Sequence, residues 1–228
     1  MNIINDFFLL LFPQYCFTCH TSLNKGEKYI CTQCVADLPK TQHHLQQENP
    51  VYQRLINIKS LQFAMSYLKF IKSGKVQKLM HYYKYKNYPE IGTVLGRWYG
   101  KDLMDAGLSS NWDMIIPVPL HAKKLKKRGY NQSAYFGQGL AASMNIDCHE
   151  NAMQRIKFSS TQTRKSRVER WKNVEQIFTV ADPEVVKNKH ILLVDDVITT
   201  GATLEACALQ LENSGARAIS VATIALAE

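Results

Sequence analysis

Residues 191–203 read ILLVDDVITTGAT, an abrupt change from branched apolar residues to two aspartates and then to hydroxyl residues around one glycine. The apolar part predicts a buried strand over residues 191–194. Beyond the glycine, apolar residues recur at helical spacing from Leu204 to Leu211, and Gly215 stands where such a helix would end. The stretch therefore predicts a strand, a loop and the start of a helix.

The rest of the chain alternates between short apolar runs and helical patterns. We expect strands at residues 60–67, 114–118, 174–180 and 219–226, and helices at residues 74–84, 91–106 and 131–144. This alternation predicts an α/β protein with a mainly parallel central sheet flanked by helices. Ligands of open parallel sheets bind beyond the carboxyl ends of the strands, which is where the loop after residue 194 would lie.

The loop over residues 195–203 combines two chemistries. Backbone N–H groups at a helix start bind phosphate together with nearby hydroxyls, and Gly201 lets the backbone approach the anion. The carboxylates of Asp195 and Asp196 repel phosphate and suit a diol or a hydrated metal ion. Together, the two parts indicate a site for a ribose 5-phosphate.

Three other classes of protein share parts of this pattern, and each lacks something here. An ATPase requires a G-x-x-x-x-G-K-[ST] loop, and residues 73–76 lack both the first glycine and the hydroxyl. A response-regulator receiver would need further sheet after Asp196, where only 32 residues of the 228 remain. A dinucleotide-binding fold requires three spaced glycines, and this loop has one.

The composition indicates a folded chain with a basic surface. Of its 228 residues, 46% are hydrophobic, enough for one substantial domain and a small accessory one. Lys and Arg number 28 against 19 Asp and Glu, for a formal net charge of +9. Such a surface attracts phosphates, polynucleotides or an anionic membrane face.

Four of the six cysteines form two C-x-x-C pairs separated by eleven residues. They are Cys16, Cys19, Cys31 and Cys34. Two such pairs supply four thiolates to a tetrahedral Zn²⁺ with no open position, so the ion would be structural. Residues 24–26 predict a turn and residues 29–30 a short strand, as in a zinc ribbon. The alternative is a pair of disulfides, which a reducing compartment disfavours.

The N-terminal apolar run FFLLLF, residues 7–12, is shorter than the roughly 20 residues that span a bilayer. An acid before it and a proline after it do not fit a secretory signal. We therefore expect a cytoplasmic protein in which this run either docks one domain on the other or makes peripheral contact with the inner membrane. A polar linker over residues 40–49 divides a zinc ribbon, residues 1–45, from the main domain, residues 50–228.

Two basic stretches contain aromatic residues. The first has five cations within residues 123–128, shortly before Tyr130, and the second covers residues 162–172. Cations that follow phosphates beside aromatics that stack on bases suit single-stranded nucleic acid. The alternatives are a solvated helix for the first and a loop that covers the sugar phosphate for the second. The candidate contacts are Lys123, Lys124, Lys126, Lys127, Arg128, Arg164, Lys165, Arg167, Arg170 and Trp171.

These motifs resemble a known family. Residues 195–203 are similar to the phosphoribosyl pyrophosphate (PRPP) motif of type I phosphoribosyltransferases. The full order of motifs resembles the ComF family of competence proteins over nearly the whole chain: the cysteine pairs, then Lys84-Tyr85-Lys86, VPL at 118–120, RGYNQ at 128–132, and Gln162, Arg167, Arg170 and Asn173 before Phe178.

The resemblance implies a zinc ribbon fused to a phosphoribosyltransferase-like domain that acts in natural transformation, the uptake of single-stranded DNA into the cytoplasm. It implies PRPP and Mg²⁺ as ligands and a ComF-type helicase of the DNA-uptake machinery as a partner. The resemblance implies that the ribose hydroxyls contact the two aspartates. The 5-phosphate would contact residues 199–203, and the pyrophosphate would contact residues 84–87. The implied PRPP contacts are Asp195, Asp196, Val197, Thr199, Thr200, Gly201, Ala202, Thr203, Lys84, Tyr85 and Lys86.

The family usually has a glycine just after the lysine–tyrosine pair, where this chain has Lys86 and Asn87. Asparagine tolerates a positive φ better than most residues, so the backbone shape can be kept. Phosphoribosyl transfer also requires cations on the departing pyrophosphate, which Lys84, Lys86 and residues 164–172 can supply.

Three hypotheses follow. The protein handles nucleic acid during DNA uptake and has a PRPP pocket, or it is an active phosphoribosyltransferase, or it is a zinc-ribbon adaptor for a helicase. We favour the first, and the sequence leaves transferase activity open because no segment identifies a pocket for an acceptor base.

Overall fold

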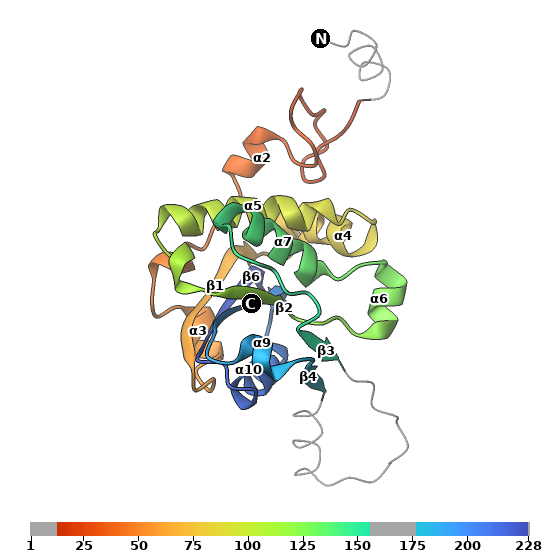
Figure 1. The fold of residues 1–228 in the computed structure, drawn as a ribbon. Coiled ribbons are helices and arrows are strands. Elements are labelled where there is room, and N and C mark those ends of the chain that lie inside the picture. Colours follow the sequence, from red (N-terminus) through yellow and green to blue (C-terminus); the bar gives the residue numbers. More distant parts are fainter. Residues whose placement is uncertain (1–12, 156–176, 228) are drawn as a thin grey trace.

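A four-stranded sheet in the order β1-β6-β5-β2 forms the centre of the molecule (Figure 1). Its strands are β1 (Leu61–Phe70), β2 (Met114–Pro117), β5 (His190–Ile198) and β6 (Ala218–Ala227). The structure is a computed structural model that describes residues 13–155 and 177–227. All three ladders of this sheet are parallel. The predicted α/β class with a parallel central sheet is confirmed.

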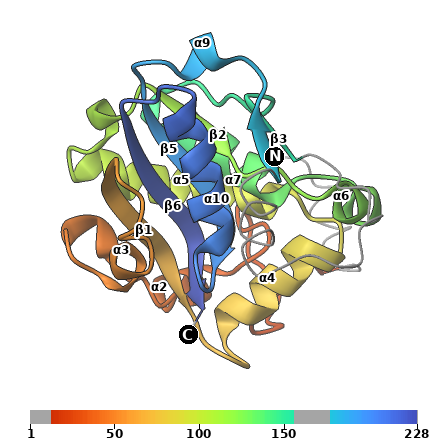
Figure 2. The same ribbon diagram turned by 90° about the horizontal axis from the view of Figure 1, so that it is seen from below.

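Helices cover both faces of the sheet (Figures 1 and 2). One face packs against α4 (Lys75–Tyr85), α5 (Glu90–Asp105) and α7 (Gln132–Met144), and the other against α10 (Ala202–Asn213) and α3 (Pro50–Arg54). Along β5, Leu192 and Val194 belong to the first core, and Ile191 and Leu193 to the second. Burial on both faces explains why this strand is a continuous apolar run.

Helices α5 and α7 cross in close backbone contact. A Cβ atom on Gly96 would lie 2.3 Å from the carbonyl oxygen of Phe136, and one on Gly139 would lie 2.3 Å from that of Thr93. Any side chain at these two positions would therefore push the helices apart. This contact fixes the position of α7, whose first turn contacts the C-terminal part of β5 through Ser133 and Asp195.

Strand β5 is longer than predicted. The apolar run suggested an end at residue 194, but the strand continues to Ile198 because β6 still offers partners: Asp195 pairs with Thr223, and Ile198 with Leu226. The two aspartates are therefore held by the ladder, and only the residues after Ile198 form the loop.

A second, small sheet is an antiparallel pair of β3 (Met153–Arg155) and β4 (Phe178–Val180). It accounts for the described part of the strand predicted at residues 174–180, whose first three residues lie outside the described ranges. The remaining short elements are α2 (Thr32–Ala36), η1 (His43–Leu45), η2 (Ser109–Asn111), α6 (Ala122–Arg128) and α9 (Pro183–Val186).

The N-terminal segment has the predicted turn but lacks the predicted strand. The N–H of Glu27 donates to the carbonyl of Asn24 at 3.0 Å, which closes the turn at residues 24–26. Residues 29–30 are bent, because the next N–H, that of Cys31, points at the sulfur of Cys16 instead of a strand partner. The expected linker packs on the sheet: the N–H of Thr41 donates to the carbonyl of Tyr67 at 3.0 Å.

Within residues 13–155 and 177–227, none of the helices combines the length and the apolar character that crossing a bilayer requires. The apolar run at residues 7–12 lies outside these ranges, and its predicted contacts stay predictions.

Candidate functional site

The carboxylates of Asp195 and Asp196 reach two different helices. The hydroxyl of Ser133, at the start of α7, donates to Oδ1 of Asp195 at 2.7 Å, and the N–H of Asp196 donates to the same oxygen at 2.8 Å. The ammonium of Lys84, at the end of α4, lies 2.9 Å from Oδ2 of Asp196. The predicted diol site and the predicted pyrophosphate loop are therefore in contact.

Burial, and then the charge of Asp196, raise the pKa of Asp195 to about 7, although the hydrogen bond from Ser133 acts in the opposite direction. A carboxyl group with this pKa exchanges its proton near neutral pH. It can accept a hydrogen bond from a sugar hydroxyl when ionised and donate one when protonated.

The loop that follows β5 has the backbone shape of an anion site. Gly201 has a φ of +89° and precedes the first turn of α10. A Cβ atom there would lie 2.7 Å from Cδ2 of Leu55, so a larger residue would meet both strain and a clash. Asp195 and residues 197–204 line a cavity of about 40 Å³ at this helix N-terminus. The N-terminal end of a 12-residue helix favours a negatively charged group.

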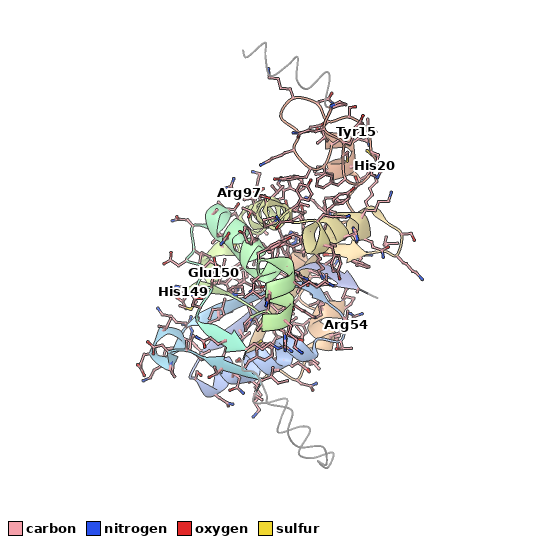
Figure 3. The ribbon with its side chains drawn as sticks, turned by 90° about the vertical axis from the view of Figure 1, so that its right-hand side faces the viewer. Tyr15, His20, Arg54, Arg97, His149 and Glu150 are labelled. Carbon is pink, nitrogen blue, oxygen red and sulfur yellow. The ribbon has the colours of Figure 1, made fainter. Side chains whose placement is uncertain are left out.

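Arg54 connects this loop to the end of the sheet. Its guanidinium donates to the carbonyl oxygen of Thr199 and, at 2.7 Å, to that of Ala227. Figure 3 labels Arg54 on the side of the molecule that carries α3. Arg54 therefore ties the start of this loop to the C-terminal end of β6.

The segment after α4 adopts the conformation that the sequence suggested. Asn87 has a φ of +60°, in the left-handed region that asparagine tolerates. Tyr85 is 57% exposed, and the guanidinium of Arg128 lies over its ring at 5.4 Å from the centroid. Residues 84–87 thus face the basic helix α6.

The RGYNQ segment holds α6 beside α4. The hydroxyl of Tyr130 donates to the carbonyl of Tyr83, and the hydroxyl of Tyr83 donates to that of Gln132. Nη1 of Arg128 donates to Oε1 of Gln132 at 2.7 Å. The first basic stretch therefore lies against the predicted pyrophosphate loop. The members of the second stretch, Arg164, Lys165, Arg167, Arg170 and Trp171, lie outside the described residues.

The four paired cysteines form one cluster. Their sulfur atoms all lie within 4.8 Å of one another, and those of Cys19 and Cys31 are 3.7 Å apart. Sulfurs bound to one tetrahedral Zn²⁺ at about 2.3 Å would be separated by roughly 3.8 Å. The N–H of Cys31 also donates to the sulfur of Cys16 at 3.3 Å. This donor set fits a four-coordinate metal ion such as zinc, and no disulfide joins the described cysteines.

Aromatic side chains join the cysteine segment to both ends of residues 84–87. The ring of Phe17 stacks on Tyr82 with centroids 4.1 Å apart, and it meets the edge of Tyr88 at 4.7 Å. Lys78 of α4 also donates to the carbonyl of Thr18 at 3.0 Å. The cysteine segment thus packs against the residues that flank this loop on both sides.

Sequence reasoning missed three contributors to the site: Ser133, Arg54 and Phe17. Ser133 follows the RGYNQ segment directly, so its position in a motif was available as a signal. Phe17 lies inside the first C-x-x-C pair, so its place in a motif was also available, whereas Arg54 lies in a short segment that no motif marks.

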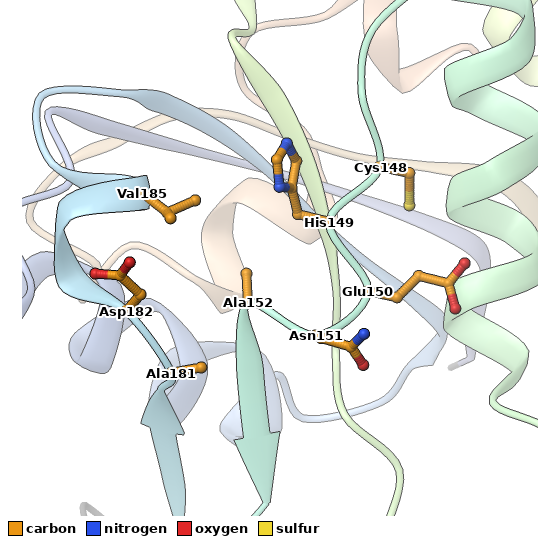
Figure 4. A pocket seen from close by; sticks show the side chains of 8 residues that line it. All are labelled: Cys148, His149, Glu150, Asn151, Ala152, Ala181, Asp182 and Val185. Carbon is orange, nitrogen blue, oxygen red and sulfur yellow. The ribbon is translucent and has the colours of Figure 1, made fainter.

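A further cavity of about 620 Å³ lies between the loop after α7 and the start of α9 (Figure 4). It is lined by Cys148, His149, Glu150, Asn151, Ala152, Ala181, Asp182 and Val185. Burial raises the pKa of the Cys148 thiol to about 12, so this thiol is a poor nucleophile. None of the predicted site residues lines this cavity.

Known proteins match this chain in two ways. Residues 131–228 match the phosphoribosyl transferase domain family. The DNA utilization protein YhgH of Escherichia coli is 28% identical over 235 residues, covering 93% of this chain and 97% of that protein. Competence protein F of Haemophilus influenzae is 33% identical over 150 residues, covering 63% and 64%. Competence protein ComFC of Bacillus subtilis is 24% identical over 211 residues, covering 92% and 82%.

Proposed function

Because the chain belongs to the ComF family, we propose that it acts in DNA uptake during natural transformation, where it binds PRPP with Mg²⁺ and single-stranded DNA at neighbouring sites. The observation that carries this proposal is the 2.9 Å ion pair between Lys84 and Asp196, which joins the diol site to a cationic loop from the other half of the chain.

PRPP has three parts that suit three parts of the site. Its ribose hydroxyls can donate to the carboxylates of Asp195 and Asp196. Its 5-phosphate suits the N–H groups at the start of α10, where Gly201 permits a close approach. Its diphosphate, which carries the Mg²⁺, suits the ammonium groups of Lys84 and Lys86. The site therefore offers hydrogen-bond acceptors to the ribose hydroxyls and hydrogen-bond donors or positive charge to both phosphate groups.

For the cysteine cluster we propose Zn²⁺ held by Cys16, Cys19, Cys31 and Cys34. The ion would supply a crosslink between two short segments that have few buried apolar residues of their own. Through Phe17 and Lys78, this crosslink would support α4 and the loop of residues 84–87.

For DNA we propose contacts from the cations of α6, a helix with no buried residue, on which the four lysines are exposed and Arg128 is half-buried. Because the incoming strand enters the cytoplasm, we propose that the protein acts at the cytoplasmic side of the inner membrane. A ComF-type helicase would be the partner that delivers the strand.

Calorimetry of PRPP with Mg²⁺ tests the sugar-phosphate site. We expect Asp196→Asn to weaken PRPP binding at least about tenfold, because one charge-assisted contact contributes about 1.5–3 kcal/mol. Asp105→Asn serves as the matched control, since Asp105 is exposed on α5 and forms a 3.7 Å ion pair with Lys101, one turn earlier on the same helix. Equal PRPP affinity in the wild type and both variants would refute the proposal that Asp196 binds PRPP.

The alternative function is transfer of a phosphoribosyl group to a nucleobase or nucleic acid, which the match to the phosphoribosyl transferase domain family favours. Release of pyrophosphate from PRPP, measured with a panel of bases and with single-stranded DNA, distinguishes the two. Turnover that Asp195→Asn removes would establish the transferase; PRPP binding without turnover would support binding alone.

A further inference from the structure

A basic cavity of about 320 Å³ lies between the C-terminal end of α4 and the helix α6, which adjoin in Figure 2. Its lining residues are Lys84, Tyr85, Asn87, Lys126, Lys127, Arg128 and Gly129. Four of these seven are cationic and none is acidic. Its volume is at the lower end of the range of small-molecule sites, about 300–1,000 Å³. The cavity is therefore large enough for one nucleotide-sized anion.

Three of the four cations of this cavity are free of carboxylate partners among the described residues. Among the described residues, no carboxylate forms an ion pair with Lys126, Lys127 or Arg128. All three lie on the last turn of α6, where no residue is buried. Positive charge concentrated on one wall of a cavity attracts phosphate more strongly than the same charge spread over a surface.

Tyr85 gives the cavity an aromatic wall. Its side chain is 57% exposed, and Arg128 lies over one face of the ring. An exposed aromatic ring beside cations is the arrangement by which proteins stack the bases of single strands while they neutralise the backbone.

We propose that this cavity binds one nucleotide unit of single-stranded DNA, with Tyr85 stacked on the base and Lys126 and Lys127 on the flanking phosphates. We further infer that the strand and PRPP exclude each other. Lys84 lines this cavity and also pairs with Asp196 of the sugar-phosphate site, so the diphosphate and the strand compete for one ammonium group. This inference rests on the proposed function, which assigns Lys84 to the diphosphate.

The two lysine pairs of α6 provide a matched comparison. Lys126→Gln/Lys127→Gln removes two charges from the cavity, and Lys123→Gln/Lys124→Gln removes two charges from the same helix outside it. We would measure fluorescence anisotropy of a labelled oligothymidine at several salt concentrations. With the full chain, the cavity variant should lower the slope of log K against log salt by about 1.4, because each phosphate contact on a single strand contributes about 0.7.

The Lys123→Gln/Lys124→Gln variant should lower this slope by less than half as much, because these two lysines lie on α6 outside the cavity. Equal losses in both variants, with the wild type binding, would overturn the cavity and leave the proposed function standing. No DNA binding by the wild type would overturn the DNA part of the proposed function, and the cavity with it.

Stacking is tested at Tyr85. We expect Tyr85→Ala to weaken DNA binding about 10- to 100-fold, as removal of a stacked base contact does, and Tyr85→Phe to retain it because the ring remains. Tyr15→Ala is the control, since Tyr15 is 51% exposed on the cysteine segment (Figure 3) and lines no part of the cavity. Loss in Tyr85→Phe as large as in Tyr85→Ala would overturn stacking.

Exclusion is tested by adding PRPP with Mg²⁺ to the protein–DNA complex. PRPP should displace the oligothymidine, and DNA should weaken PRPP binding by the same factor, as linkage requires. Ribose 5-phosphate, which has no diphosphate to reach Lys84, should leave the complex intact at equal concentration. If the wild type binds PRPP and DNA at the same time without loss of affinity for either, the two ligands do not exclude each other. Such a result would leave both binding sites supported.

Discussion

Replacing Asp195 with asparagine should stabilise the folded protein at about pH 8 and remove a pH dependence of stability that the wild type shows between about pH 4 and pH 7. Burial and the charge of Asp196 raise the pKa of Asp195 from 3.8 to about 7. Between those values the folded state keeps a proton that the unfolded chain has lost. The free energy of unfolding therefore falls as the pH rises through this window and levels off above it.

The size of this effect follows from the shift. Three pKa units correspond to about 4 kcal/mol, at 1.36 kcal/mol for each unit. Because Asp195 as a residue is half-buried rather than fully enclosed, solvent screening reduces the expected gain to about 2 kcal/mol. Asparagine can keep the local hydrogen bonds, since its carbonyl oxygen can accept from both the Ser133 hydroxyl and the Asp196 N–H.

Urea unfolding followed by circular dichroism, with zinc present throughout, measures the free energy of unfolding at each pH. Wild type and Asp195→Asn should agree near pH 4 and separate by about 2 kcal/mol near pH 8. Asp105→Asn, which changes an exposed carboxylate, should follow the wild type to within about 0.5 kcal/mol. Parallel pH profiles for wild type and Asp195→Asn, or a less stable variant at high pH, would refute the reasoning.

Three further perturbations test the neighbouring structure. Gly201→Ala forces a side chain onto a φ of +89°, 2.7 Å from its nearest neighbour, so we expect a loss of about 2 kcal/mol in urea unfolding and loss of ribose 5-phosphate binding by calorimetry. Gly139→Ala should lower the free energy of unfolding by about 3 kcal/mol, because the added methyl group overpacks α5 against α7. Its control, Gly107→Ala, lies at φ +73° in open space and should lower it by only about 1 kcal/mol through backbone strain. Equal thermal shifts for the two variants would contradict this. Phe17→Ala should weaken PRPP binding several-fold, because Phe17 packs against the residues that flank the loop of residues 84–87. Removal of the proposed Zn²⁺ with a chelator should have the same effect, and Tyr15→Ala should have none. Unchanged PRPP affinity in Phe17→Ala, measured by calorimetry, would show that the aromatic contact is only structural.

Periodicity and spacing were sufficient for much of the fold. The strand at 114–118 and the helices at 91–106 and 131–144 were predicted to within one or two residues, because their apolar patterns record burial directly. The end of β5 was wrong by four residues, because Asp195 and Asp196 stay in the ladder through their partners on β6 and not through any preference of their own. The strand at residues 29–30 was wrong because a cysteine sulfur takes the N–H that a neighbouring strand would have used.

By itself, the sequence determined which chemical groups this protein has: paired thiolates at metal spacing, two acids beside a glycine-containing loop, and a basic helix. Such signals are local, since each lies within a few residues along the chain. Only the tertiary structure decided that Lys84 meets Asp196 and shares a cavity with Lys126 and Lys127, and that Phe17 supports this loop. Those contacts join segments far apart in sequence, and they arise because α4 lies against both α6 and the cysteine segment, which no local pattern records.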